Sequence, residues 1–170
     1  LALVAGQHGL NDGGAGTDVL TGGLGNDQMY GGDFSDAFFI GANEGNDTIA
    51  GGETGYDFDT VVFTGAGGVS VTFTGSEAGT YSHNGGTGTF SEIEGIQTSD
   101  AADTINGGAN TSNMNVWAGG GSDSITSGSG NDGIEGGDGN DTVATGAGND
   151  NVNAGSGNDS VDLSAGNDSA

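Results

Sequence analysis

The chain contains no cysteine, no proline, no lysine and no arginine among its 170 residues. Without cysteine, it can form neither a disulfide nor a thiolate metal site. Without lysine or arginine, it has no side chain of fixed positive charge to place against phosphate groups, which excludes nucleic acid as a direct partner and disfavours anionic membranes. The sequence also has no apolar run long enough for a transmembrane helix, so we expect no membrane insertion.

Glycine and carboxylate groups dominate what is present. The chain has 40 glycines and 24 Asp and Glu residues, and its formal net charge is −24. Composition alone would be typical of a disordered acidic polymer. The order of the residues indicates the opposite, because a fixed short period is typical of a solenoid.

The clearest repeat spans residues 119–170, where an aspartate recurs every nine residues. A glycine stands two residues before each aspartate, an aliphatic residue stands two residues after it until the last copy, and asparagine directly precedes the last five. The cleanest copy is Gly136 to Ala144, and the segments Gly13 to Thr21 and Gly22 to Tyr30 follow the same pattern. The aspartates of the clearest repeat are Asp123, Asp132, Asp141, Asp150, Asp159 and Asp168.

This pattern resembles the nonapeptide G-G-x-G-x-D-x-U-x of the repeats-in-toxin (RTX) family, in which U is a large aliphatic residue. The resemblance implies an all-β fold, a right-handed parallel β-roll or β-solenoid with two nonapeptides in each coil. It further implies that several calcium ions lie between consecutive coils. Each ion would be bound by one Asp and two turn carbonyls from either coil.

Physical chemistry leads to the same architecture. The residues x-U-x form a short strand whose U side chain alone points inward, because side chains alternate along a strand. The other six residues reverse the chain direction, which favours glycine. Aspartates two repeats apart then stack at about 4.8 Å, where they repel unless a cation lies between them. Calcium suits this site because it accepts carboxylate and backbone oxygens. Without metal the chain should be disordered or loose.

Two sets of ligands are predicted. Stacking favours the calcium pairs Asp123/Asp141, Asp141/Asp159, Asp132/Asp150 and Asp150/Asp168, with Asp18/Asp36 in the N-terminal part. The carboxylate ligands are Asp18, Asp27, Asp36, Asp47, Asp103, Asp123, Asp132, Asp141, Asp150, Asp159 and Asp168. The carbonyl ligands are those of Gly14, Gly16, Gly23, Gly25, Gly119, Gly121, Gly128, Gly130, Gly137, Gly139, Gly146 and Gly148.

The repeat is lost in the middle of the chain. Beyond Asp36 the spacing slips: Asp47 follows after eleven residues, and Asp57, after ten more, is the next aspartate that the pattern suggests. We expect strands over residues 61–63, 69–73 and 87–90, as wider coils or a β excursion on the same solenoid; a separate binding domain is the alternative. The predicted organisation is therefore one solenoid, 1–170, with an N-terminal RTX-like block (1–60), an irregular segment (61–100) and a C-terminal RTX block (101–170).

No catalytic residues are predicted, and we expect no enzymatic activity. The two histidines, His8 and His83, are far apart in sequence and lack the H-E-x-x-H pattern of a zinc protease. Asn113 takes the place of a ligand aspartate, and Trp117 is interpreted as a plug that covers an irregular coil.

Three functions fit these features. The first is a calcium-binding structural β-roll that folds outside the cell or on the bacterial cell surface, where calcium is abundant, and that associates end to end into a homo-oligomer, filament or adhesin-like stalk. The second, suggested by the resemblance, is the type I secretion and folding module of an exoenzyme such as a protease or lipase. The third is recognition of ice or glycan by the ladder of asparagines, which the irregular residues beside that ladder disfavour.

Overall fold

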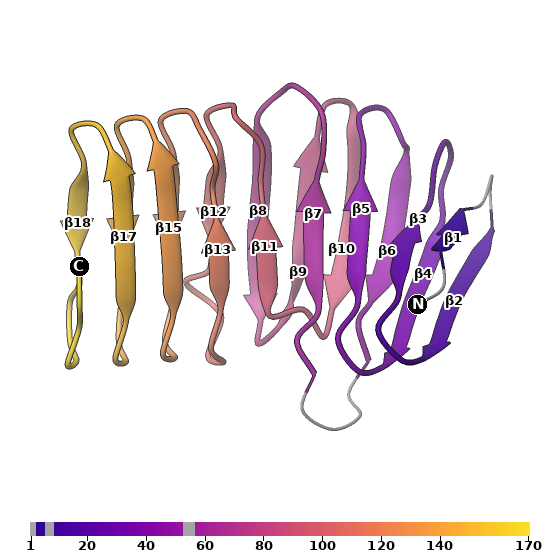
Figure 1. Cartoon of the computed structure of the whole chain (residues 1–170), viewed down its shortest axis with the longest axis horizontal. Coiled ribbons are helices and arrows are strands. Elements are labelled where there is room, and N and C mark those ends of the chain that lie inside the picture. The colour runs from indigo at the N-terminus through magenta and orange to yellow at the C-terminus, as the bar shows by residue number, and fades with distance from the viewer. Residues whose placement is uncertain (1–2, 6–8, 53–56) are drawn as a thin grey trace.

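The computed structural model of the protein describes residues 3–5, 9–52 and 57–170. The described residues form two sheets, one of eight strands and one of ten. None of them forms a helix long and apolar enough to cross a membrane. The sheets face each other and run the length of an elongated molecule, with the N-terminus and the C-terminus at opposite ends (Figure 1).

The eight-stranded sheet consists, in spatial order, of β1 (Leu3–Ala5), β3 (Val19–Thr21), β5 (Ala37–Ile40), β7 (Thr60–Phe63), β11 (Gly95–Gln97), β13 (Asn115–Trp117), β15 (Gly133–Asp138) and β17 (Asn151–Ser156). The ten-stranded sheet consists of β2 (Leu10–Ala15), β4 (Gln28–Asp33), β6 (Asn46–Ala50), β10 (Gly86–Ser91), β9 (Ala78–His83), β8 (Val69–Gly75), β12 (Thr104–Asn106), β14 (Ser124–Thr126), β16 (Thr142–Ala144) and β18 (Ser160–Asp162). Successive strands therefore alternate between the sheets over most of the chain, which confirms the predicted parallel β-roll.

Register in the C-terminal part follows from the repeat. Ile134 pairs with Val152 in one sheet, and Val143 pairs with Val161 in the other, both in parallel. Because side chains alternate along each strand, the U residue points inward and stacks on the U residue of the next coil. Ile125, Ile134, Val143 and Val152 are accordingly all buried.

The middle of the chain departs from this pattern within the ten-stranded sheet. Strand β9 pairs antiparallel with β8 on one side and with β10 on the other. In turn, β10 pairs parallel with β6, and β8 pairs parallel with β12. The expected strands at 69–73 and 87–90 are therefore present in lengthened form, and β9 is a strand that the sequence did not reveal. The excursion lies within the same sheet as the repeats; the division into blocks 1–60, 61–100 and 101–170 stays a prediction.

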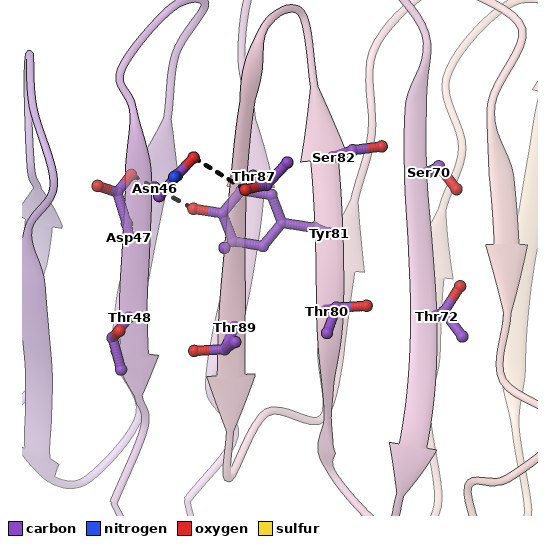
Figure 2. A pocket seen from close by; sticks show the side chains of 11 residues that line it. Asn46, Asp47, Thr48, Ser70, Thr72, Thr80, Tyr81, Ser82, Thr87 and Thr89 are labelled. Atoms are coloured by element: carbon purple, nitrogen blue, oxygen red, sulfur yellow. Dashed lines mark hydrogen bonds between the residues drawn. The ribbon is translucent and has the colours of Figure 1, made fainter.

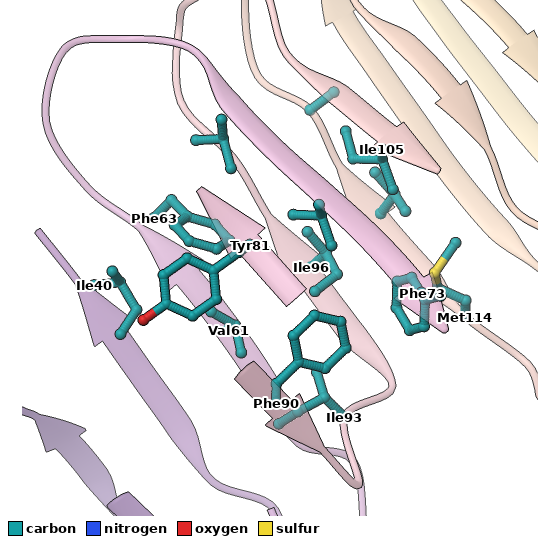
Figure 3. Close-up of a cluster of buried hydrophobic side chains, with 14 of the residues drawn as sticks. Ile40, Val61, Phe63, Phe73, Tyr81, Phe90, Ile93, Ile96, Ile105 and Met114 are labelled. Atoms are coloured by element: carbon teal, nitrogen blue, oxygen red, sulfur yellow. The ribbon is translucent and has the colours of Figure 1, made fainter. Parts of the chain in front are cut away.

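Aromatic side chains fill the wider core beneath these strands (Figure 3). The rings of Phe63 and Tyr81 meet edge to face with centroids 5.1 Å apart, and those of Phe73 and Phe90 do so at 5.0 Å. One aliphatic residue per repeat fills the narrow coils, whereas here the longer strands enclose more space. Large rings are the side chains that fill such space with few voids.

Core packing can be tested with two leucines of the N-terminal part. Leu20 is fully buried, whereas Leu24 is 61% exposed. In saturating calcium, we expect Leu20→Ala to lower the free energy of unfolding by about 2–5 kcal/mol. Leu24→Ala, the matched control, should change it by less than about 0.5 kcal/mol. Urea unfolding followed by circular dichroism measures both; equal effects would contradict the assigned core.

Candidate metal centre

Each predicted carboxylate ligand except Asp168 lies at or beside the start of a strand, where a glycine-rich turn enters the sheet. Asp168 precedes Ser169, which forms an isolated bridge to Asn151. Asp18 precedes β3, Asp123 precedes β14 and Asp141 precedes β16. Although they are carboxylates, nine of the eleven side chains are buried, and Asp141 is only 1% exposed. Asp159 and Asp168, in the last coils, are partly exposed. The nine-residue spacing causes this, because it brings every aspartate to the same point of each half-coil.

The carboxylates stack along both edges of the roll and are joined by hydrogen bonds. From Asp27 onwards, one oxygen, Oδ1, of each predicted ligand accepts a backbone N–H from the residue in the equivalent position one coil earlier. The backbone N–H of Asp123 donates to Asp141 Oδ1 at 2.9 Å, and that of Asp132 donates to Asp150 Oδ1 at 2.9 Å. The same bond joins Asp18 to Asp36, Asp27 to Asp47, Asp103 to Asp123, Asp141 to Asp159 and Asp150 to Asp168. The structure thus brings together all the pairs that stacking predicts.

The second carboxylate oxygen faces a different environment. In the part of the chain that the structure describes, the Oδ2 atoms of several of these side chains are buried and have no hydrogen-bond partner: those of Asp27, Asp36, Asp59, Asp123, Asp132, Asp141 and Asp150. A buried anionic oxygen without a donor is costly. No lysine or arginine exists to neutralise it. These atoms therefore require either a proton or a bound cation.

Backbone oxygens lie close to these Oδ2 atoms. At Gly136, a Cβ would meet Asp141 Oδ2 at 2.7 Å and the carbonyl oxygen of Ala154 at 2.5 Å. At Gly139, whose φ is +150°, a Cβ would overlap the carbonyl oxygen of Gly121 in the preceding coil. Among the described residues, no three His, Cys, Asp or Glu side chains gather into a metal cluster. The available donors are pairs of carboxylates and backbone carbonyls, a hard-oxygen set that fits calcium.

The predicted glycine carbonyls lie between neighbouring coils. The carbonyl oxygens of Gly119, Gly128 and Gly130 each approach the point where a Cβ would stand on the equivalent glycine of the next coil. Some have a second role: Gly119 O accepts the backbone N–H of Asp138 at 2.9 Å. A carbonyl oxygen has two lone pairs, so such a bond leaves capacity for a cation. Which carbonyls bind metal stays a prediction.

Burial raises the pKa of several of these carboxyl groups. It raises that of Asp123 to about 6, from an ordinary 3.8, even though a hydrogen bond from the Asp103 backbone lowers it. Burial likewise raises the pKa of Asp36, Asp47, Asp103 and Asp132. Each raised pKa means that the folded, metal-free chain disfavours the charged form of that side chain.

The asparagines that precede the aspartates have a structural role that sequence reasoning missed. The backbone N–H of Asn149 donates to Asn131 Oδ1 at 2.8 Å, and that of Asn167 donates to Asn149 Oδ1 at 2.9 Å. Asn131 N–H likewise donates to Asn113 Oδ1 at 2.7 Å. A second ladder of side-chain acceptors thus runs beside the carboxylates. Because these amide oxygens already bond to the next coil, the ladder favours a structural role over recognition of ice or glycan.

Two positions in the irregular part differ from the sequence-based assignment. Asp59, not Asp57, directly precedes β7, and its Oδ1 accepts the backbone N–H of Asp36 at 2.7 Å. The pattern Asp59-Thr60-Val61 matches Asp47-Thr48-Ile49 and could have revealed this. Met114, not Asn113, takes the place of a ligand aspartate, because its backbone N–H donates to Asp132 Oδ1.

Asp47 lies where the excursion meets the repeats. Its Oδ1 accepts the backbone N–H of Asp27, and its Oδ2 accepts the hydroxyl of Tyr81 at 3.3 Å (Figure 2). Next to it, the hydroxyl of Thr87 donates to Asn46 Oδ1 at 2.8 Å. On this side the carboxylate stack of the N-terminal part therefore ends on a phenol instead of on another aspartate.

Of the two histidines, the structure describes only His83. His83 is buried against Phe63, with ring centroids 5.7 Å apart. His8 lies outside the described residues. Trp117 is partly buried and meets Phe58 edge to face at 6.3 Å. That Trp117 covers the irregular coil stays a prediction.

A parallel β-solenoid with buried carboxylates stacked along both edges is a calcium-binding β-roll. Comparison with protein families supports this assignment: the model for the RTX calcium-binding nonapeptide repeat matches four segments, residues 12–37, 41–53, 115–134 and 135–170. These cover more than half of the chain, and the protein belongs to the RTX calcium-binding nonapeptide repeat family. The β-roll of this family is a structural, calcium-binding fold. No curated protein matches the chain in sequence.

The raised pKa values predict an unusual pH dependence for the metal-free protein. Asp123 and Asp59 have folded-state pKa values of about 6 and about 8, above the ordinary 3.8. The folded chain therefore binds more protons than the unfolded chain, so the stability contributed by these groups is present at low pH and is lost as pH rises through 6 to 8.

Circular dichroism of metal-stripped protein in calcium-free buffer, between about pH 5 and pH 8.5, measures this effect. We expect the β signal or the urea midpoint to fall as pH rises. Saturating calcium should reverse the trend, since protons compete with metal for carboxylates. A metal-free protein that becomes more stable towards pH 8 would contradict the assignment.

Proposed function

We propose that the protein is an exported, non-catalytic structural module that folds when it binds calcium outside the cell or on the bacterial cell surface. The observation that carries the proposal is the row of buried Asp Oδ2 atoms that have no donor in the described residues. Inside a cell, where free calcium is scarce, these groups would keep the chain loose. Outside, where calcium is abundant, binding would supply folding free energy.

The proposed sites lie between consecutive coils. In the C-terminal part, the pairs Asp123/Asp141 and Asp141/Asp159 would serve one edge, and Asp132/Asp150 and Asp150/Asp168 the other. Each ion would take one carboxylate and turn carbonyls from both coils. When bound, calcium supplies the positive charge that the chain lacks, while the aspartates keep their backbone hydrogen bonds to the previous coil.

Asp141 tests this arrangement because it belongs to two pairs. We expect Asp141→Ala to remove about two calcium ions and to raise the calcium midpoint of folding, since the sites on either side lose a ligand. Glu135→Ala is the control, because Glu135 is an exposed carboxylate in the same region. Isothermal titration calorimetry gives the ion count of each variant. If Asp141→Ala keeps the wild-type count, the proposed stacking is wrong.

End-to-end association is a second candidate property. In the described part of the chain, β18 is the outermost strand of its sheet and pairs only with β16. Its inward residue Val161 is half-buried, whereas its counterpart Val143 is 1% exposed. An open strand edge beside a partly exposed apolar residue favours pairing with another coil, either further along a longer chain or in a second copy.

Light scattering tests association of this chain. We expect the mass to rise with protein concentration in calcium and to return to that of a monomer after chelation, because only the folded roll has an ordered edge. Val161→Lys, which places charge at the edge, should keep the protein monomeric while its calcium-induced β signal is retained. A wild-type protein that stays monomeric at high concentration in calcium would reject the association.

The alternative function is that of a secretion and folding module of an exoenzyme, such as a protease or lipase. It uses the same calcium chemistry, so calcium binding does not separate the two functions. The parent polypeptide decides between them. A catalytic domain encoded in the same chain would support the exoenzyme, and a long array of repeats would support a stalk.

A further inference from the structure

A cluster of carboxylates lies outside the nonapeptide repeats, at the join between the N-terminal coils and the excursion. Its centre is Asp59, which precedes β7 and is 0% exposed. The family model matches none of residues 54–114, so this aspartate lies outside the matched nonapeptide repeats although the short pattern Asp59-Thr60-Val61 resembles their strand entry. Acidic residues alone do not make a site, but Asp59 Oδ2 is a buried oxygen without a hydrogen-bond partner among the described residues.

Asp59 continues the carboxylate stack of its edge. Its Oδ1 accepts the backbone N–H of Asp36 at 2.7 Å, as a repeat aspartate would. Its own backbone N–H donates to Glu94 Oε2 at 2.7 Å, so Glu94 takes the place of the next aspartate. These partners are 23 and 35 residues apart instead of 18. The edge thus runs Asp18, Asp36, Asp59, Glu94 across the excursion.

The surroundings of Asp59 Oδ2 reproduce those of a repeat aspartate. At Gly51, a Cβ would meet both Asp59 Oδ2 and the carbonyl oxygen of Glu92. At Gly136 in the regular part, the same point is close to Asp141 Oδ2 and the carbonyl oxygen of Ala154. Two oxygens, one carboxylate and one carbonyl, therefore converge at both places. At Asp59 the carbonyl comes from Glu92, whose φ of +59° lies in the left-handed region.

The charges around Asp59 favour a cation. Burial raises the pKa of Asp59 most, and the negative charges of Glu94, Asp36 and Asp57 raise it further. Neutralising one carboxyl group with a proton would leave the Oδ2 atom of Asp36 nearby, which is also buried and also lacks a donor in the described residues. The carbonyl oxygen of Gly51 lies beside Asp36 Oδ2, because a Cβ placed on Gly31 would meet both atoms. A divalent cation would satisfy both carboxylate oxygens at once.

We propose that Asp59, with Asp36 and the carbonyl oxygens of Gly51 and Glu92, forms a further calcium site that the nonapeptide motif does not encode, with Glu94 positioning Asp59. The inference rests on the proposed function, since it extends the same carboxylate chemistry to residues outside the repeat. This site would link the starts of the neighbouring strands β5, β7 and β11, next to the point where the chain leaves the repeats for the excursion.

The test uses the whole chain and three substitutions that keep side-chain size: Asp59→Asn, Asp141→Asn as the reference within the repeat, and Asp12→Asn as the control for loss of one charge, because Asp12 is exposed. Titration calorimetry gives the calcium count. Hydrogen exchange with mass spectrometry shows where calcium protects the backbone. We expect Asp59→Asn to bind at least one ion fewer than Asp12→Asn and to lose calcium-dependent protection in β7 and β11, while β14 and β16 stay protected.

A second variant keeps the proposal testable should Asp59→Asn fail to fold. Glu94→Gln keeps an acceptor for the Asp59 backbone N–H but removes the charge. We expect Glu94→Gln to lower the calcium affinity of the proposed site about tenfold. The affinity is measured as the calcium concentration at which β7 reaches half of its protection from hydrogen exchange. A normal calcium count and normal β7 protection in Asp59→Asn would overturn the inference, leaving Asp59 as a protonated core residue. If Asp141→Asn is also without effect, the proposed function itself fails.

Discussion

Burial of stacked carboxylates in a chain without lysine or arginine is the constraint on which this structure depends. At strand spacing, two such charges repel by about 3 kcal/mol at an effective dielectric constant of about 20. One oxygen of each aspartate is stabilised by the backbone N–H of the previous coil, as in the bond from Asp123 to Asp141. The other oxygen has no such donor, so the folded roll must hold protons or cations at these positions.

The carboxylate stacks on the two edges of the roll are interrupted at different places in the irregular part of the chain. On one edge, the antiparallel strands β8 to β10 interrupt the stack, and Tyr81 donates a hydroxyl to Asp47 at the break. On the other edge, Asp59 and Glu94 carry the stack past the excursion, and the break comes at Met114, an uncharged residue. The excursion thus leaves one edge continuous at the place where the other is broken.

The regular part of the fold could be predicted from the sequence because one residue type recurs at one spacing. In residues 119–170, each copy of the repeat except the last indicates where the strand lies, which residue points inward and which residue is the candidate ligand. The irregular part could not be predicted, for two reasons. Between Asp36 and Asp59 the chain contains an insertion that changes the period of the repeat. In addition, β9 lacks an alternation of apolar residues strong enough to indicate a strand. The row of asparagines is visible in the sequence, but its hydrogen bonds could not be predicted. They join one coil to the next, so they follow only from the register of the coils.

The most direct test of the account compares the order of the whole chain with and without calcium. Far-ultraviolet circular dichroism should show a disordered or loose chain after metal is stripped at pH 8, and a cooperative gain of β signal on addition of calcium but not of a monovalent salt. A chain as ordered in chelator as in calcium would contradict the central claim that bound cations make the buried carboxylates tolerable.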